Sequence, residues 1–307
     1  MNNQEGRKIL VTGATGTVGS EVLKQLTSVS SGTCIRAAVH SKNKAEEIRQ
    51  YTDKGVEIAA LDYTKPETVT NALIDVNKLF LQTLPVPDAT DICSNIVREA
   101  KKNGVNYIVK LSAMGADSKL GSTILRLHGE EEKIIKESGI PYTFLRPPAF
   151  MQNFITQFGQ IIRTQNAFYA PAGEAKMSFV DTRDIAAIAV AMLMNGTNGA
   201  NKQYMDKVFD TTGQEALSYS QVAEILSNGI GRKISYIDIT EDAAKKGLKQ
   251  IGMNDWFIYI MIELFRIIKA GYGSEMTAEV EHITGRKPIA FAQFVKDYAE
   301  VFRYVGL

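Results

Sequence analysis

The stretch that decides the fold is Lys8-Ile-Leu-Val-Thr-Gly13-Ala-Thr-Gly16-Thr-Val-Gly19. A short apolar run, typical of a buried strand, leads into three glycines, and a helical pattern continues from Thr17 to Leu26. A strand, a glycine-rich turn and a helix in this order favour binding of a dinucleotide. The free N–H groups and the dipole at the helix N-terminus attract the pyrophosphate.

Each glycine of this loop has its own expected role. Gly13 permits the tight turn, Gly16 lets the backbone approach the pyrophosphate, and Gly19 allows the helix to pack closely on the sheet. The spacing is G-x-x-G-x-x-G instead of the standard G-x-G-x-x-G, and the alternative is a turn with a structural role only. The residues predicted to contact the cofactor are Gly13, Thr15, Gly16, Thr17, Val18 and Gly19.

The first half of the chain alternates short apolar runs with helical patterns. This alternation predicts an α/β fold with a Rossmann-type, doubly wound parallel sheet. The expected strands are 8–12, 34–39, 56–61, 78–82, 107–111 and 142–145. The expected helices are 17–26, 44–51, 66–73, 88–103 and 122–138.

The regular alternation stops after Pro147-Pro148. From there we expect a helix over 150–164, a loop over 168–173, strands over 179–180, 204–209 and 233–239, and helices capped by Asp184 and Ser218. Residues 1–150 are therefore expected to form the dinucleotide-binding domain, to which residues 178–210 return. Residues 151–177 and 211–307 are expected to form a smaller, mainly C-terminal substrate-binding part.

Charge and composition exclude several classes of partner. The 307 residues carry 35 basic and 34 acidic side chains, a formal net charge of +1, which gives no global attraction to nucleic acid or to a membrane surface. The apolar run Trp256 to Ile268 is too short to span a bilayer. The N-terminus has no signal-peptide pattern, and the two cysteines, Cys34 and Cys93, are expected to be buried thiols, so a cytoplasmic location is expected. The three histidines show no metal-ligand spacing.

The end of the second expected strand bears on the choice between NAD(H) and NADP(H). An acidic residue about 20 positions after the loop would bind the ribose hydroxyls of NAD. Here the residues are basic or polar, and a 2′-phosphate site made of Arg36, His40, Ser41 and Lys42 favours NADP(H) over NAD(H). The alternative is a solvated basic turn. Asp62 and Tyr63 are placed to flank the adenine, although Asp62 could equally cap the next helix.

Several segments together resemble a known family. They are the glycine loop, Asp62-Tyr63, Leu111-Ser-Ala-Met-Gly-Ala116, Leu127-His-Gly-Glu-Glu-Glu-Lys133, Ser138 to Pro147 and Phe179-Val-Asp-Thr-Arg-Asp-Ile185. This run is similar to the NmrA-like branch of the atypical short-chain dehydrogenases/reductases over the whole chain. The resemblance implies NAD(P)H-dependent reductases, such as quinone and triphenylmethane-dye reductases, but also non-catalytic regulators that sense dinucleotides. Family members often carry Arg where this chain has His40, and the Tyr-x-x-x-Lys pair of ordinary members is missing.

The chemistry is expected beyond the carboxyl ends of the strands. The residues expected around the nicotinamide are Thr83, Leu84, Pro85, Ser112, Pro148 and Phe150. His128 is a candidate proton donor, with Glu132 four residues on to raise its basicity, or else a structural histidine. Ser112 is a candidate to bind a substrate carbonyl, or else a loop cap.

An aromatic and Met-rich lining is expected for the substrate, formed by Met114, Phe150, Asn153, Phe154, Tyr169 and Trp256. The alternative is the hydrophobic core, to which some of these residues must belong. We therefore expect an NAD(P)H-dependent reductase of small, flat, apolar acceptors, namely quinones, imines or dyes, acting as a monomer or homodimer. The alternative is an NADP(H)-sensing regulator that binds a protein partner. An epimerase or dehydratase is disfavoured by the missing Tyr-x-x-x-Lys pair.

Overall fold

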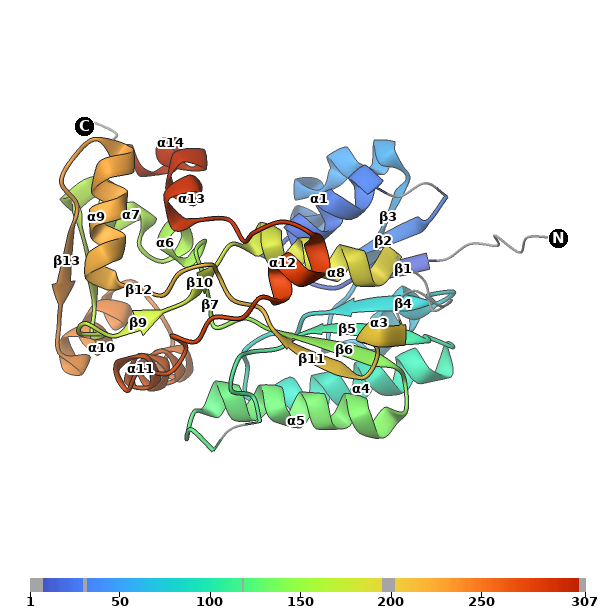
Figure 1. Ribbon diagram of the computed structural model, residues 1–307. Helices are drawn as coiled ribbons and strands as arrows, with labels where there is room; N and C mark the ends of the chain where they lie inside the picture. The colour runs from blue at the N-terminus through green and yellow to red at the C-terminus, as the bar shows by residue number, and fades with distance from the viewer. Residues whose placement is uncertain (1–7, 30–31, 118, 195–201, 304–307) are drawn as a thin grey trace. The chain divides into compact units, whose positions relative to one another are not determined.

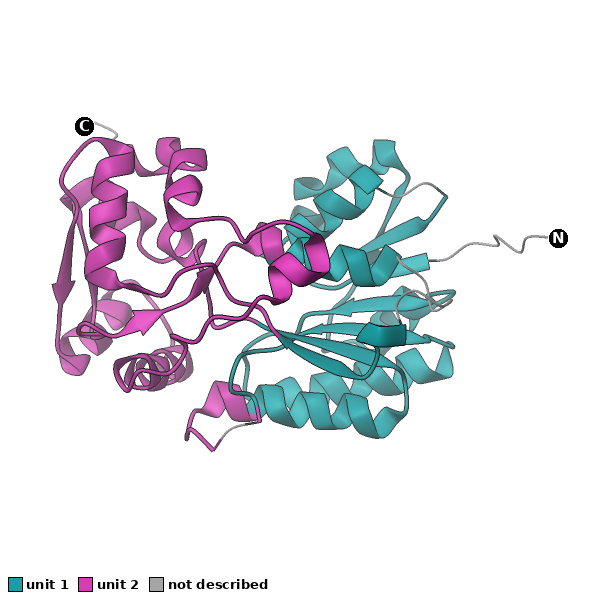
Figure 2. Cartoon of the chain, viewed as in Figure 1, with its two compact units in different colours: residues 1–116, 127–146, 185–209 teal, residues 117–126, 147–184, 210–307 magenta. Residues whose placement is uncertain are grey.

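The computed structural model describes residues 8–29, 32–117, 119–194 and 202–303. The chain divides into two compact units, which Figure 2 distinguishes by colour. The first unit contains residues 1–116, 127–146 and 185–209, and the second contains residues 117–126, 147–184 and 210–307. Residues 117–126, 147–150, 178–184 and 210 thus belong to the second unit, whereas the sequence pattern had placed them in the first. The segment with no signal-peptide pattern lies outside the described residues.

The first unit is built on a seven-stranded sheet with the order β11-β6-β5-β4-β1-β2-β3. The pairs β1–β2, β2–β3, β1–β4, β4–β5 and β5–β6 are all parallel. The strand order runs outward in both directions from β1 and β4, as the doubly wound prediction requires. The strands are β1 (Lys8–Val11), β2 (Cys34–Val39), β3 (Val56–Ala60), β4 (Lys78–Leu81), β5 (Tyr107–Leu111), β6 (Tyr142–Arg146) and β11 (Lys207–Asp210).

Helices cover both faces of this sheet, which explains why its strands are apolar on both sides. Figure 1 shows α4 (Ala89–Lys102) and α5 (Thr123–Ser138) on one face and α1 (Gly19–Val29) on the other, with most of α8 (Thr182–Met194). A core cluster joins α3 (Pro66–Leu73), α4 and α5 to the strands through residues such as Leu79, Ile108 and Phe144. The short helices α2 (Lys42–Glu47), η1 (Arg49–Lys54) and η2 (Lys202–Tyr204) complete the unit.

The second unit has short strand pairs and many helices. Strand β7 (Ala149–Phe150) pairs with β10 (Phe179–Val180), β8 (Ala167–Ala170) with β13 (Ser235–Asp238), and β9 (Lys176–Met177) with β12 (Leu217–Ser218). Phe154 sits within an aromatic core with Phe158, Phe168, Phe179, Tyr219 and Phe291. The helices are α6 (Asn153–Thr156), α7 (Gly159–Gln165), α9 (Tyr219–Ile230), α10 (Glu241–Gln250), α11 (Asp255–Lys269), α12 (Glu279–Thr284), α13 (Phe291–Asp297) and α14 (Ala299–Phe302).

Three local predictions in the second half were wrong. The expected helix over 150–164 is a strand residue followed by the two short helices α6 and α7, because Phe150 pairs with Val180. The expected loop over 168–173 begins as β8, which hydrogen-bonds to the distant β13. Asp184 is not a cap but lies inside the first turn of α8, where its carboxylate accepts from Arg286 and from the Ile289 N–H. Ser218, by contrast, does cap α9 through a capping box with Gln221.

Candidate functional site

The glycine loop joins β1 to α1 by a very tight turn. Gly13 has φ +61°, and its carbonyl accepts a 2.8 Å hydrogen bond from the Gly16 N–H. A Cβ atom on Gly19 would lie only 2.1 Å from the Gly13 carbonyl oxygen, so only glycine fits there. The predicted roles of Gly13 in the turn and of Gly19 in close packing are confirmed. Cofactor contact by Thr15, Gly16, Thr17 and Val18 stays a prediction.

Gln82 forms one wall of this loop, and sequence reasoning missed it. Its side-chain amide would lie 3.2 Å from a Cβ on Gly13 and 3.4 Å from one on Gly16. The Gln82 N–H donates to the Thr12 hydroxyl at 2.7 Å, which fixes the end of β4 against the end of β1. Its side-chain Oε1 is buried without a hydrogen-bond partner among the described residues. A signal was available, since Gln82 is a polar residue directly after a fully buried strand.

The basic turn after β2 holds three of the four predicted 2′-phosphate residues. His40 and Lys42 are exposed. Ser41 caps α2 by accepting from the Lys44 N–H, which places the start of a helix at this turn. Arg36 must be removed from the set. Its guanidinium binds Glu57 at 2.8 Å and donates to the carbonyl groups of Ala72 and Ile74, so its hydrogen bonds are already committed.

Asp62 and Tyr63 form the turn before α3. The Asp62 carboxylate accepts from the Thr64 N–H and hydroxyl and pairs with Lys65 at 3.0 Å, contacts that lower its pKa to about 2. Lys65, not Asp62, is the N-cap of α3, so the capping alternative is wrong. Tyr63 packs its half-buried ring against the core, and burial raises its pKa to about 12.

A buried charged cluster lies behind the carboxyl ends of β4 and β5. Lys110 Nζ is 2.9 Å from Glu131 Oε2, with both side chains buried, and also donates to the Leu111 carbonyl and the Thr83 hydroxyl. His128 Nδ1 lies 3.3 Å from the same Glu131 oxygen. Burial is the largest cause of a lowered pKa for His128, followed by the Lys110 charge. The lowered pKa favours the neutral form of His128, so less of the protonated form is available at neutral pH than the predicted role of proton donor requires.

Glu132 does not hold His128, contrary to our prediction. Its carboxylate binds the Arg146 guanidinium through two bonds of 2.6 and 2.8 Å and accepts from the Ser112 hydroxyl at 2.6 Å. All three side chains are buried. The Ser112 hydroxyl thus donates its hydrogen bond to Glu132. It neither caps a loop nor offers a free donor to a substrate. Arg146, the last residue of β6, outcompetes His128 for this carboxylate.

The remaining predicted residues differ in what they expose. In the first unit, Leu84 and Pro85 are exposed and Met114 is half-buried. In the second unit, Pro148, Phe150, Asn153, Tyr169 and Trp256 are half-buried. Phe154 is only 1% exposed and belongs to the aromatic core, so its assignment as a substrate-lining residue was wrong.

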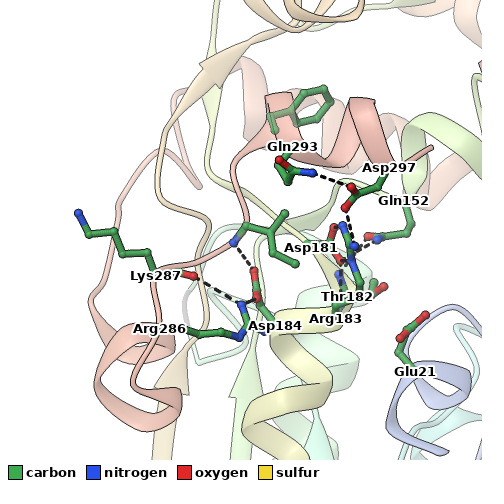
Figure 3. A network of polar contacts seen from close by, with 12 residues as sticks. Glu21, Gln152, Asp181, Thr182, Arg183, Asp184, Arg286, Lys287, Gln293 and Asp297 are labelled. Atoms are coloured by element: carbon green, nitrogen blue, oxygen red, sulfur yellow. Dashed lines mark hydrogen bonds and ion pairs between the residues drawn. The ribbon is translucent and has the colours of Figure 1, made fainter. Parts of the chain in front are cut away.

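A polar network in the second unit surrounds Asp181, as Figure 3 shows. The fully buried Asp181 carboxylate accepts from the Arg183 backbone and guanidinium and from the Gln152 amide. Arg183 also binds Asp297 at 2.6 Å. Each of these groups has a protein partner, so the network ties β10 and the start of α8 to the C-terminal helices and is structural.

Both cysteines are unpaired thiols. Cys93 is fully buried in α4, which raises its pKa to about 12. Cys34 is only half-buried, and its Sγ donates to the Glu57 carboxylate at 3.3 Å. Burial, together with this hydrogen bond, raises the Cys34 pKa.

The helices and the polar side chains of the described residues bear on two other classes of site. None of the helices there combines the length and the apolar run needed to cross a membrane. In the same ranges, no three or more His, Cys, Asp or Glu side chains gather in a way that could hold a metal ion.

Comparison with known proteins places the chain. The model of the NmrA-like family matches residues 5–295. An NAD(P)H azoreductase from Xenophilus azovorans is 36% identical over 294 residues, covering 96% of this chain and 99% of the relative. Triphenylmethane reductase from Citrobacter sp. has a TM-score of 0.82 at 24% identity, covering 95% and 99%. An NADPH-dependent quinone oxidoreductase from Escherichia coli, solved with NADPH, has a TM-score of 0.81 at 25% identity, covering 94% and 99%.

Gly19→Ala is expected to destabilise the chain by about 1–3 kcal/mol or more, because the new methyl group overlaps the Gly13 carbonyl. Gly247→Ala is the matched control. Gly247 lies in α10 with open space around it, so this change should increase the free energy of unfolding by about 0.5–1 kcal/mol. Urea unfolding measures both, and equal effects would refute the steric role of Gly19.

Lys110→Met is expected to lower the free energy of unfolding by about 3–5 kcal/mol, because it leaves the Glu131 charge buried without its cation. Lys133→Met, on the exposed side of α5, breaks a 3.7 Å surface pair with Glu137 and should cost less than about 1 kcal/mol. Chemical denaturation of the two variants side by side gives the comparison. A Lys110 variant no less stable than the Lys133 variant would contradict the buried pair.

Proposed function

The chain belongs to the NmrA-like family, and we propose that it is an NAD(P)H-dependent oxidoreductase that transfers hydride to a small, flat, apolar acceptor. The observation that carries this proposal is 36% identity, over nearly the full length of both chains, to an NAD(P)H azoreductase. The acceptor class is a quinone, an imine or iminium compound, or a dye. The fold neighbours that reduce quinones and triphenylmethane dyes, by their names, support the same class.

The residues of the first unit fit a dinucleotide. The Gly13–Gly19 contact brings the start of α1 against the end of β1, so the free N–H groups of the first turn of α1 lie at the glycine loop, where a pyrophosphate would bind. The buried Oε1 of Gln82, which has no partner in the described ranges, is a polar group that a ligand could satisfy. Bound NAD(P)H would supply the hydride from nicotinamide C4.

We assign the adenosine end of the cofactor to the turn after β2. His40, Ser41 and Lys42 are proposed to bind a 2′-phosphate at the start of α2, where the helix dipole adds to the basic side chains. Asp62 and Tyr63 are proposed to flank the adenine. This assignment supports NADP(H) over NAD(H), as does the NADPH-bound fold neighbour.

Within the first unit, the nicotinamide end is assigned to Thr83, Leu84, Pro85 and Ser112. For the second unit, contact of Pro148 and Phe150 with the cofactor stays a prediction from the sequence. Ser112 contributes its hydroxyl oxygen as an acceptor, because its O–H group donates to Glu132 and its backbone N–H group donates to the Leu145 carbonyl. Met114, Asn153, Tyr169 and Trp256 remain the proposed contacts of the acceptor. Two unpaired thiols favour the proposed cytoplasmic location, and a monomer or homodimer stays our expectation.

NADPH oxidation should be measurable with at least one member of a panel of quinones, azo dyes, iminium compounds and triarylmethane dyes. The fall in absorbance of the reduced cofactor provides the rate, and binding of NADPH is measured separately by calorimetry. Tight binding of NADPH with no turnover on any acceptor would contradict the reductase. It would favour a regulator that senses the dinucleotide.

His40→Ala combined with Lys42→Ala should weaken NADPH binding by about tenfold or more while changing NADH binding little, because only NADPH carries the extra phosphate. Arg36→Ala is the control, since Arg36 is bound to Glu57 and should affect both cofactors alike. Titration calorimetry with each cofactor measures the effects. Equal losses for NADPH and NADH in the double variant would refute the phosphate site.

A further inference from the structure

Lys110, Glu131 and His128 form a chain of contacts that has no role in the reductase as proposed above. Lys110 on β5 is fully buried, and its ammonium group is fixed by the Glu131 carboxylate at 2.9 Å, the Leu111 carbonyl at 2.6 Å and the Thr83 hydroxyl at 3.3 Å. Glu131 on α5 is only 1% exposed. A charge pair this deeply buried costs desolvation free energy, so a purely stabilising role is a weak explanation for it.

His128 is the group at the outer end of this chain. Its Nδ1 atom is buried and lies 3.3 Å from the Glu131 carboxylate. Its side chain as a whole is nevertheless 19% exposed, whereas the Nδ1 atom itself is buried. The Nδ1 edge of the imidazole therefore faces the interior of the protein, beside Glu131.

The charges determine where the proton of His128 sits. Glu131 is buried, which by itself would raise its pKa, but the Lys110 charge and the His128 contact outweigh burial and lower the pKa to about 2. An ionised carboxylate repels a ring lone pair and attracts an N–H group, so the ring nitrogen that faces it at 3.3 Å carries the hydrogen, although the two groups do not have hydrogen-bond geometry. Burial and the Lys110 charge oppose a second proton, while Glu131 and Glu132 favour one, and the balance lowers the His128 pKa.

Glu132 is not an alternative holder of the ring. Both of its oxygens are bound by Arg146, and one also accepts from Ser112. The two neighbouring carboxylates of α5 thus have separate cations, Lys110 for Glu131 and Arg146 for Glu132.

We propose that Lys110 and Glu131 are positioning residues that hold His128 as a neutral imidazole with its hydrogen on Nδ1, so that Nε2 offers a lone pair to an N–H or O–H donor of the bound ligand. In this arrangement His128 is a hydrogen-bond acceptor and not a general acid. Resting on the proposed function, the consequence is that no acid from the protein is needed. Hydride transfer to a cationic iminium compound or triarylmethane dye gives a neutral product, and hydride transfer to a neutral quinone leaves an anion, which takes its proton from water. The hydroxide formed is neutralised by the buffer.

Nitrogen-15 NMR of the imidazoles in the full chain tests the tautomer without any cofactor. The chain has three histidines, so His40→Gln and His282→Gln assign the spectrum. Between about pH 6 and 8 we expect His128 to show a protonated Nδ1 and an unprotonated Nε2. A protonated Nε2, or an imidazolium at pH 7, would overturn the proposal.

The double variant Lys110→Met with Glu131→Met tests the role of the pair. It removes both charges together, so the fold should tolerate it better than loss of one charge. His128 should then lose its single tautomer and give a mixture, while the exposed His282 stays unchanged. A His128 spectrum identical to that of the unmodified chain would show that Lys110 and Glu131 do not position the ring.

Kinetics separate an acceptor from an acid. His128→Gln retains an acceptor oxygen, so kcat should fall by less than about tenfold, whereas His128→Leu should weaken NADPH or substrate binding by about 2- to 10-fold through the lost hydrogen bond. Loss of a general acid would instead lower kcat of the Gln variant by about 10²–10⁴-fold. His282→Gln is the control. A chain with no reductase activity would refute the proposed function, and the NMR result would still decide the tautomer.

Discussion

The contact between Gly13 and Gly19 is the constraint on which the first unit depends. The carbonyl of Gly13 occupies the place where any side chain on Gly19 would begin. This contact brings the first turn of α1 against the end of β1, and the hydrogen bond from Gln82 to Thr12 then aligns β4 beside it. The result is a loop with its backbone open at the point where the sheet changes direction, which is where α/β folds bind their ligands.

The sequence predicted the first unit well because its signals are local. Each strand of the first half up to β6 corresponds to a short apolar run, and each long helix has the expected period. The second unit could not be predicted in this way. Strand β7 is two residues long and is a strand only because Phe150 meets Val180, about thirty positions later, and β8 depends on β13 at still greater separation. Pairing partners at such distances leave no local pattern.

The charged residues of the site show the same limit at a finer scale. Helix geometry places both Glu131 and Glu132 within reach of His128, at three and four residues, and periodicity cannot choose between them. The choice is made by Arg146, which comes from a different element and occupies Glu132. Arg36 is a similar case, since its basic character suggested a phosphate, but the neighbouring strand supplies Glu57 as its partner. Prediction of polar site residues from sequence fails where such competing partners are distant in the chain.

The states of the two thiols have a consequence for an enzyme that handles quinones. Quinones are electrophiles that add to sulfur by Michael addition, and the reactive form of cysteine is the thiolate. Cys93 is inaccessible and remains protonated, and the Cys34 hydrogen bond to an anionic carboxylate opposes its ionisation. At neutral pH the chain therefore offers little thiolate to its own acceptors.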